Sequence, residues 1–336
     1  MKRSAAVLVF VALLGGMVFA QDTVRIGVQL ELSGRMAVTG NDTLFGMEVA
    51  RSLQPEVLGM QVELSVCDNA STVEGAVACA NRFADEGVVA VLGSYSSSHS
   101  IPAADVLQDA GIVMVATGAT NPAVTQIGDY IFRVPYTDEF EGTVAAQYAY
   151  NDLGARNVAI FRQQDDDYSV GLAGFFLDGL ERLGGEGLML DYAANAVDFS
   201  AQINNMRTFT PDLIYLSAFC AENASLVPQL RQQGFEQPIL GGAAMDDSQC
   251  PDGGGAVFDG IQFFSFGEPE VLSGAAAERA REFHAAFSQL HSDDHFTGFT
   301  LSGADAYRVV WQAINDAGVA ESAAVRDALA ALVDFP

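Results

Sequence analysis

The chain has 336 residues, half of them hydrophobic, and a formal net charge of −27. This length can hold two domains with cores of their own, and so acidic a surface excludes binding to a nucleic-acid backbone or to anionic lipid. Lys2 is the only lysine, which excludes Schiff-base, Ser–Lys and lysine-dependent phosphate-loop chemistry from the rest of the chain.

The amino terminus has the pattern of a secretory signal peptide. Lys2 and Arg3 precede an apolar run from Ala5 to Leu14, and the small-residue pattern of a cleavage site follows at Val18–Ala20. The run is shorter than the roughly 20 residues that a membrane span needs. We therefore expect cleavage after Ala20 and an exported, soluble mature protein. A retained membrane anchor is the alternative.

Strand-like and helix-like segments alternate after the signal. The strands are apolar on both faces, as in a parallel sheet that helices cover on two sides. Ser71 and Glu74 have the spacing of a capping box at the start of the second helix. In this first unit we predict strands at Val24–Leu30, Gln61–Cys67, Val88–Leu92 and Ile112–Ala116, and helices at Thr43–Leu53, Thr72–Glu86 and Ile101–Ala110.

The segment Tyr130–Thr137 predicts a strand followed by a crossing, after which the alternation starts again. Gly260–Ser265 predicts a strand that leads back. The pattern indicates an α/β fold of two doubly wound, Rossmann-like lobes joined by a hinge, with residues 21–138 and 266–336 in the first lobe and 139–265 in the second. The remaining predicted strands are Asn157–Phe161, Gly187–Tyr192, Leu213–Leu216 and Pro238–Gly241, and the helices are Phe140–Leu153, Tyr168–Leu183, Phe199–Arg207, Glu222–Gln233, Ser273–Leu290, Ala304–Ala317 and Ser322–Leu332.

The four cysteines of an exported protein can form disulfides. Cys220 ends one strand and Cys250 lies in the loop after the next, so we expect this pair to be bonded. Cys67 ends a strand and Cys79 lies about two turns into the following helix, a separation that we expect to approach or exceed disulfide reach. Since no CxxC motif occurs, we expect neither a metal ribbon nor a thioredoxin-type site, and we predict no cofactor.

Two loops of small hydroxyl and glycine residues follow neighbouring strands, at Ser94–Ser98 and Thr117–Thr120. Loops of this kind, with the helix N-terminus after the first, offer free N–H groups and hydroxyls to an anion. We interpret the pair as a site for the carboxylate of a small molecule. Ordinary turn chemistry is the alternative for each loop alone.

Several polar or aromatic residues near these loops have two interpretations. Tyr95 projects either into the cleft or into the core, and Tyr168 opens a helix as a cleft aromatic or lies on the surface. Arg35 either adds charge to the anion site or is a solvated arginine, and we expect His99 to contact solvent.

Two clusters have the residue types of a metal site. Asp165–Asp167 lacks the spacing and downstream Glu of a calcium loop, so we expect a solvated loop there. His291 and His295 lie at a helix end without an evident third ligand, so we expect a polar loop and no zinc.

The order and spacing of these motifs resemble the periplasmic leucine/isoleucine/valine-binding protein family, whose members have the type I periplasmic binding fold and serve ABC importers. The resemblance covers nearly all of the mature chain, and its most specific element is Gly118–Pro122. The other matching elements are Leu32–Gly34, Cys79–Phe83, Ser96–Ser98 before Pro102, Tyr168–Leu172 and Pro211–Tyr215.

The resemblance implies that two lobes close on a small amino acid, branched-chain or similar, without catalysis and without a metal. The ligand carboxylate would be bound by Ser97 and Thr120 and its amino group by the Gly118 carbonyl. Tyr168 and residues near Phe219 would cover the ligand from the second lobe. It also implies a periplasmic monomer that delivers its ligand to an ABC permease. The full set of expected ligand-binding residues is Tyr95, Ser97, Ser98, Gly118, Ala119, Thr120, Tyr168, Phe219 and Asp246.

The sequence departs from the family pattern at Ala243, where amino-acid-binding members often carry an acid that pairs with the ligand ammonium. Either Asp246, Asp247 or Glu222 substitutes, or the ligand is a carboxylate or amide without an α-ammonium. Family chains also continue past a segment like Asp334–Pro336, so we expect the last hinge crossing to be missing here.

An exported hydrolase and a ligand sensor are the rival functions. The serines lack the G-x-S-x-G pattern of a nucleophile elbow, and none of the four histidines has a recognisable catalytic partner. A sensor would use the same fold, so the sequence does not separate it from a transport protein.

Overall fold

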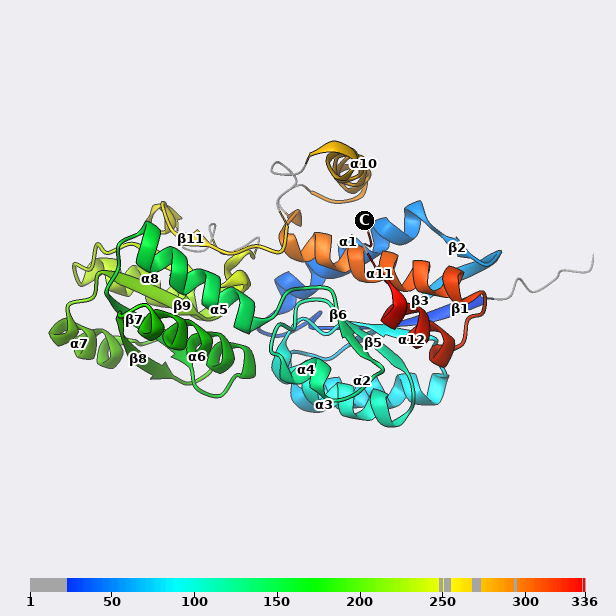
Figure 1. Cartoon of the computed structure of the whole chain (residues 1–336), viewed down its shortest axis with the longest axis horizontal. Helices are drawn as coiled ribbons and strands as arrows, with labels where there is room; N and C mark the ends of the chain where they lie inside the picture. The colour runs from blue at the N-terminus through cyan, green and yellow to red at the C-terminus, as the bar shows by residue number, and fades with distance from the viewer. Residues whose placement is uncertain are drawn as a thin grey trace, which may run out of the picture.

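The computed structural model describes residues 23–247, 250, 255–267, 273–292, 295–333 and 335. Within them the chain forms two α/β lobes, which lie side by side along the long axis of the molecule (Figure 1). The predicted signal peptide, residues 1–20, lies outside the described residues. Among the described helices, none combines the length and apolar character needed to cross a membrane.

The first lobe is built on a sheet with the strand order β2-β3-β1-β4-β5-β6. All neighbouring strands are parallel except the short edge strand β2, which pairs antiparallel with β3. The strands are β1 (Thr23–Leu30), β2 (Glu56–Val57), β3 (Met60–Asp68), β4 (Ala90–Leu92), β5 (Val113–Ala116) and β6 (Ile131–Arg133), and the helices are α1 (Ala37–Leu53), α2 (Val73–Glu86), α3 (Ser97–Asp109), α4 (Ala123–Gln126), α10 (Gly274–Leu290), α11 (Gly298–Ala317) and α12 (Ser322–Ala331).

The second lobe is built on a wholly parallel sheet with the order β11-β10-β9-β7-β8. The chain enters it after β6 and leaves it after β11, so helices α10 to α12 pack back on the first lobe. The strands are β7 (Asn157–Gln163), β8 (Glu186–Tyr192), β9 (Leu213–Ser217), β10 (Ile239–Gly241) and β11 (Gln262–Phe263), and the helices are α5 (Asp138–Gln147), α6 (Asp167–Arg182), α7 (Ser200–Phe209) and α8 (Cys220–Gln232).

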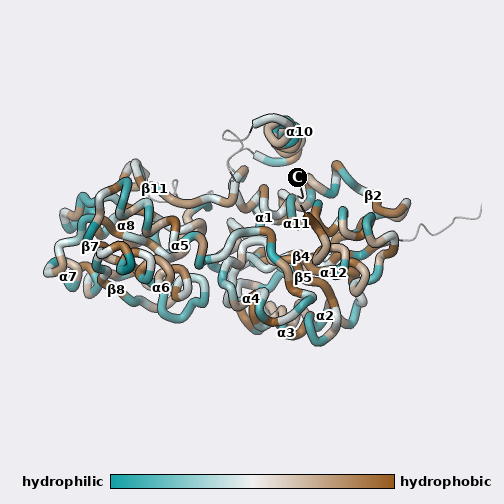
Figure 2. Tube along the Cα trace, in the orientation of Figure 1, coloured by the Kyte–Doolittle hydropathy of each residue, from teal (hydrophilic) through white to brown (hydrophobic). Residues whose placement is uncertain are grey.

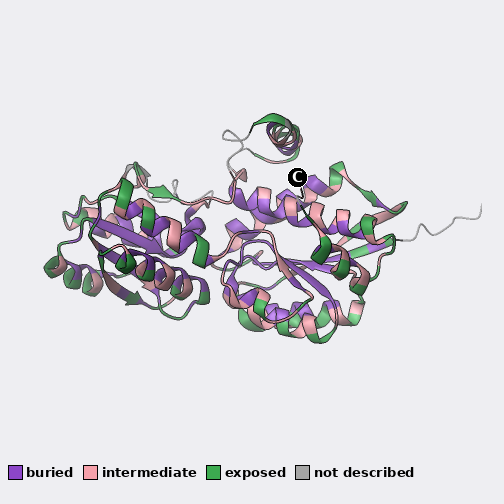
Figure 3. Ribbon diagram, viewed as in Figure 1, coloured by how far each residue is buried: buried purple, intermediate pink, exposed green. Residues whose placement is uncertain are grey.

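Each sheet is covered by helices on both faces. In the first lobe, α1 and α11 bury one face of the sheet and α2 and α3 bury the other. In the second lobe, α5 and α6 cover one face and α7 and α8 the opposite one. The central strands are therefore hydrophobic (Figure 2) and almost entirely buried (Figure 3), which explains why the sequence shows no polar alternation along them.

Three helices begin earlier than the sequence predicts. α1 starts at Ala37 instead of Thr43, α3 at Ser97 instead of Ile101, and α11 at Gly298 instead of Ala304. Their first turns contain glycine, serine or threonine, which favour caps and turns over helix interiors. At Gly46 a β-carbon would lie 1.9 Å from the Thr300 carbonyl oxygen, so glycine permits the close approach of α1 and α11.

The predicted capping box at the start of α2 is wrong by one residue. Thr72 is the N-cap, and its hydroxyl accepts a hydrogen bond from Gly75 N–H at 3.0 Å. Ser71 has a left-handed backbone, with φ of 54°, and its hydroxyl donates to the Ser33 carbonyl at 2.7 Å. Ser71 therefore ties the loop after β1 to the loop after β3 instead of capping the helix.

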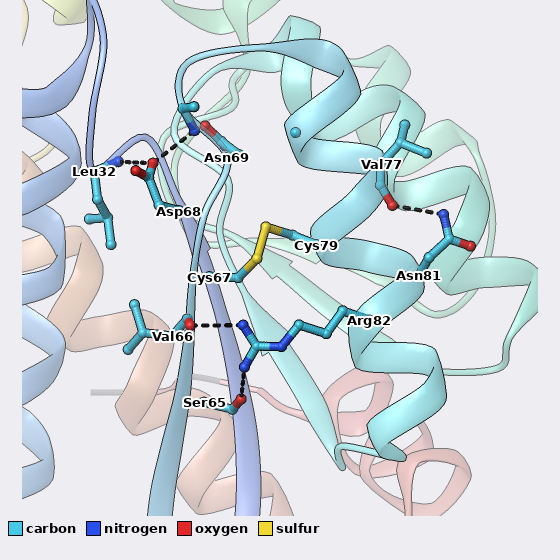
Figure 4. Close-up of a disulfide and its surroundings, with 12 residues drawn as sticks. Leu32, Ser65, Val66, Cys67, Asp68, Asn69, Val77, Cys79, Asn81 and Arg82 are labelled. Carbon is cyan, nitrogen blue, oxygen red and sulfur yellow. Dashed lines mark hydrogen bonds between the residues drawn. A yellow bond between two sulfur atoms is a disulfide. The ribbon is translucent and has the colours of Figure 1, made fainter.

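Both cysteine pairs form disulfides, so the expectation that Cys67 and Cys79 lie too far apart is wrong. Their Cα atoms are 5.8 Å apart, and those of Cys220 and Cys250 are 5.3 Å apart. Left-handed backbone at Ala70 and Ser71 turns the chain sharply after β3, which brings α2 back along that strand (Figure 4). Arg82 supports the same contact by donating to Ser65 Oγ at 2.8 Å.

Candidate functional site

A small, almost filled pocket lies between the lobes, where strands of both sheets end. Parallel α/β sheets place their ligand sites at this edge. This cavity is lined by Tyr95, Ser96, Ser97, Gly118, Tyr168, Phe219, Ala243, Ala244, Phe266 and Phe299.

The first lobe provides the polar wall of the cavity. β4 ends at Leu92, and after a short loop Ser96 is the N-cap of α3 and Ser97 its first residue. Both serines are buried, and Ser96 Oγ has no hydrogen-bond partner in the described part of the chain. Ser97 Oγ accepts from Asn121 N–H at 3.2 Å. The N-terminus of α3 therefore faces the cavity with free N–H dipoles and hydroxyls, as an anion site requires.

A buried carboxylate supports this wall from behind. Glu31, at the end of β1, accepts hydrogen bonds from the Ser94 hydroxyl and from the N–H groups of Tyr95 and Ser96. Its Oε1 also lies 2.6 Å from Nδ1 of His99. The prediction that His99 contacts solvent is wrong: its side chain is only 7 % exposed, because the first turn of α3 points it back at Glu31.

Aromatic rings form the rest of the cavity. Tyr168, from the start of α6, is buried, and its hydroxyl accepts from Ala244 N–H at 3.3 Å. Phe219 packs between the lobes, with its ring centroid 5.5 Å from that of Tyr168 and 5.9 Å from that of Tyr95. Tyr95 also meets Phe299 edge to face at 4.8 Å. This apolar enclosure suits a hydrocarbon side chain beside the polar wall.

Phe266 and Phe299 are lining residues that the sequence reasoning missed. Phe299 lies in the first turn of α11, five residues before the predicted start of that helix, and Phe266 lies in the crossing after β11. Their rings contact each other at 4.9 Å. The only available signal was the spacing of aromatic residues around the return crossing.

Four expected ligand residues are not among those that line the cavity: Ser98, Ala119, Thr120 and Asp246. Ala119 is packed in the first-lobe core, and the Thr120 hydroxyl is buried beside Asp138. Ser98 donates a hydrogen bond to Asp166 of the second lobe, and Asp246 accepts hydrogen bonds from Ser265 and from the N–H of Gly298. Their ligand roles therefore stay predictions.

The two lobes contact each other through hydrogen bonds around the cavity. Ser98 Oγ donates to Asp166 Oδ2 at 3.0 Å, and Thr39 Oγ1 donates to Asp247 Oδ2 at 2.6 Å. Asp166 is 4 % exposed and caps α6 by accepting from Ser169 N–H, so the prediction of a solvated loop at Asp165–Asp167 is wrong for its central residue.

Arg35 forms the strongest charged contact between the lobes. Its Nη1 lies 3.0 Å from Glu222 Oε2 and 3.2 Å from Oε1, and its guanidinium lies 4.8 Å from the centre of the Phe219 ring. Glu222 is 1 % exposed. The interpretation of Arg35 as a solvated arginine is wrong, because its partner is a buried carboxylate of the other lobe. A contribution of its charge to the anion site stays a prediction.

Two further carboxylates are buried near the crossing between the lobes. Burial raises the pKa of Asp138, against the lowering effect of Thr120 and Arg133. Burial likewise raises the pKa of Glu141 to about 8, against the hydrogen bond from Ala243 N–H and the hydroxyl of Tyr136. Neither acid was predicted as a site residue.

The histidine pair near the end of α10 shows no metal geometry. His295 Nδ1 lies 2.7 Å from Asp42 Oδ1, and His291 stacks on Phe45. Within the residues that the structure describes, no three potential ligands converge on a common point. Residues 293 and 294 lie outside them.

The family model for periplasmic binding proteins matches residues 23–336. The chain belongs to the periplasmic binding protein family. Membership assigns the protein to the periplasm and identifies the two-lobed structure as a type I periplasmic binding fold. The family consists of binding proteins, so the alternative of an exported hydrolase has no support.

Solved structures of this fold superpose closely. A leucine-binding protein, LivK, from Thermotoga maritima has a TM-score of 0.87 and 32 % identity, over 91 % of this chain and 87 % of that one. LivJ, a branched-chain amino acid transporter substrate-binding protein from Streptococcus pneumoniae in complex with isoleucine, has a TM-score of 0.85 and 26 % identity, over 94 % and 89 %.

Curated relatives show the same resemblance at the level of sequence. An amino acid binding protein of Pseudomonas aeruginosa is 31 % identical over 219 residues, 64 % of this chain and 58 % of the relative. The leucine-specific-binding protein of Salmonella typhimurium is 28 % identical over 268 residues, 78 % of this chain and 72 % of the relative. The chain thus spans between about half and three quarters of these two relatives.

Proposed function

We propose that this protein is the substrate-binding component of an ABC importer and that it binds a small amino acid, branched-chain or similar, between its two lobes. The observation that carries the proposal is the cavity, with a hydroxyl-rich helix N-terminus on one side and an aromatic enclosure on the other. Groups of these two kinds can bind a carboxylate and a short hydrocarbon side chain side by side. The relatives whose names state a ligand support the same class of ligand.

The proposed binding mode starts on the first lobe. The ligand carboxylate docks on Ser97 and Thr120, and the Gly118 carbonyl accepts from the amino group. Tyr95, Ser98 and Ala119 shape this side of the site. The second lobe, proposed to comprise residues 139–265, then closes over the ligand with Tyr168, Phe219 and the segment of Asp246. Closure excludes water, which strengthens the polar contacts and creates the surface that the permease recognises.

Calorimetric titration with leucine, isoleucine and valine tests the function. We expect the purified mature protein to bind at least one of them, and Ser97→Ala and Thr120→Ala each to weaken binding about tenfold or more, since each removes a hydrogen bond to a charged group. Thr208→Ala, an exposed threonine on α7, is the matched control. Unchanged affinity in both site variants would refute the carboxylate site.

The alternative ligand, a carboxylate or amide without an α-ammonium, rests on Ala243, which lines the cavity where an acid would otherwise stand. A sensor that reports the ligand to another protein would use the same site. Transport of labelled ligand by cells that carry the adjacent permease separates the sensor from the importer component. We also propose a monomer that begins at Gln21, which intact mass and light scattering of exported protein would test.

A further inference from the structure

The three acids considered above as substitutes for an acid at position 243 all have other partners. Glu222 pairs with Arg35, and Asp247 accepts from Thr39. Asp246 Oδ2 accepts from Ser265 Oγ at 2.6 Å and from Gly298 N–H at 2.9 Å. A positive charge in the cavity would have to compete with these contacts to reach any of them.

Glu141 lies in the first turn of α5 and is packed against the same turn that forms the cavity wall. It is 1 % exposed, and its Oε1 accepts a hydrogen bond from Ala243 N–H at 3.0 Å. A β-carbon added to Gly242 would lie 3.0 Å from this oxygen and 2.4 Å from the Tyr168 hydroxyl. The Glu141 carboxyl therefore lies behind the backbone of Ala243, which lines the cavity. It also lies beside the Tyr168 ring, which lines the cavity as well.

The second oxygen of Glu141 lacks a well-formed hydrogen bond. The Tyr136 hydroxyl lies beside the carboxyl, but neither this hydroxyl nor the buried Oε2 has a partner of ordinary hydrogen-bond geometry among the described residues. A buried carboxylate oxygen without a donor is costly, and such groups persist where a function needs them.

We propose that Glu141 selects ligands that carry a protonated amine, in place of an acid at position 243. The assignment rests on the proposed function. The carboxylate head of the ligand docks at the N-terminus of α3, the side chain enters the aromatic enclosure, and the amine points past Ala243 toward Glu141.

Proton exchange accompanies this recognition. The groups that face Glu141 are the hydroxyls of Tyr136, Tyr168 and Tyr215 and the carboxyl of Asp138, all of them neutral or acidic. Burial raises the pKa of Glu141 to about 8, which favours the neutral acid in the empty site at pH 7. An ammonium favours the ionised form, so binding of an amino acid at pH 7 releases a proton from Glu141.

The test compares Glu141→Gln with Glu139→Gln, an exposed acid in the same helical turn. Each is titrated with leucine and with 4-methylpentanoate, which is leucine without its amine. We expect Glu141→Gln to lose tenfold or more of its affinity for leucine and to keep its affinity for 4-methylpentanoate. Glu139→Gln should behave as the wild type.

The outcomes separate this inference from the proposed function. Wild-type protein that binds none of leucine, isoleucine or valine overturns the proposed function and the assignment together. Wild-type protein that binds leucine, with the same affinity in Glu141→Gln, overturns the assignment alone. If the variant does not fold, leucine binding to the wild type in buffers of different ionisation enthalpy decides: release of nearly one proton at pH 7 supports the assignment, and no release overturns it.

Discussion

At the scale of single residues, the polar wall of the cavity depends on a side chain that never reaches the cavity. Glu31 holds the Ser94–Ser96 loop through two backbone N–H groups and one hydroxyl, and it pairs with His99. Burial raises the pKa of Glu31, but His99, Ser94 and Asn69 together outweigh burial and lower it below the ordinary value of 4.5.

Glu31→Gln should lower the free energy of unfolding by about 2–3 kcal/mol at pH 7, because it removes a buried charged acceptor. Since the folded pKa is depressed, this stability is present above about pH 4.5 and is lost as pH falls through the folded pKa. Urea unfolding at several pH values measures it. Glu63→Gln, in an exposed pair with Arg25, is the control. A difference between wild type and Glu31→Gln that does not shrink in acid would contradict the prediction.

The pKa of Glu141 is shifted in the opposite direction, so its effect on stability has the opposite pH dependence. Its raised pKa means that the folded, empty protein loses stability as pH rises from 4.5 toward 8, because only the unfolded chain ionises readily there. Glu141→Gln should therefore melt at or above the wild-type temperature at pH 8 without ligand. If Glu141→Gln melted at a lower temperature than Glu139→Gln at pH 8, the prediction that buried Glu141 destabilises the empty protein there would be wrong.

The sequence was informative about residues whose role depends on local pattern. Ser97, Gly118, Tyr168 and Phe219 were predicted from strand ends and family motifs, and all of them line the cavity. Residues whose role depends on a distant partner were missed or misread. Asp166 looks solvated in a run of three acids, and only the fold shows that Ser98, 68 residues away in sequence, donates to it.

At the scale of elements, the strands that the sequence predicted lie within one to three residues of those observed, and helix starts were less accurate. The short strand β2 and the short helix α4 were not predicted. Strand ends follow from runs of buried hydrophobic residues, whereas the first turns of α1, α3 and α11 are made of glycine, serine and threonine. These residues have low helix propensity, so the sequence alone gives a weak signal for where each helix begins.

The Cys67–Cys79 bridge fastens α2 to the end of β3. Cys67→Ala with Cys79→Ala should lower the free energy of unfolding by about 2–3 kcal/mol, because a short loop of the unfolded chain is no longer closed. Guanidinium unfolding with and without reductant measures the change. Reductant should destabilise the variant less than the wild type, and an equal effect on both would show that this bridge contributes nothing.

At the scale of the whole molecule, the contacts between lobes surround the cavity. Arg35–Glu222, Thr39–Asp247 and Ser98–Asp166 each pair a residue of the first lobe with one of the second. Because each contact forms only when the lobes are together, we expect these residues to contribute to ligand affinity by stabilising the closed state.

Arg35→Gln should weaken ligand binding about tenfold or more, because it leaves Glu222 buried without its cation when the lobes meet. Arg35→Gln with Glu222→Gln should recover part of the loss. Calorimetry measures both, and small-angle scattering reports the separation of the lobes. Arg162→Gln breaks an ion pair within the second lobe and should leave affinity unchanged. Equal losses in the single and double variants would contradict an interlobe role.

Each of the two disulfides joins elements of a single lobe, and no cysteine remains free. Disulfide formation therefore stabilises each lobe against heat and proteolysis. The angle between the lobes depends only on non-covalent contacts, which can break and form again. The redox state of the compartment would determine the lifetime of the folded protein. The rate at which a molecule binds and releases its ligand would depend on the contacts between the lobes instead. A less oxidising compartment would thus lower the amount of folded protein before it changed how fast each remaining molecule works.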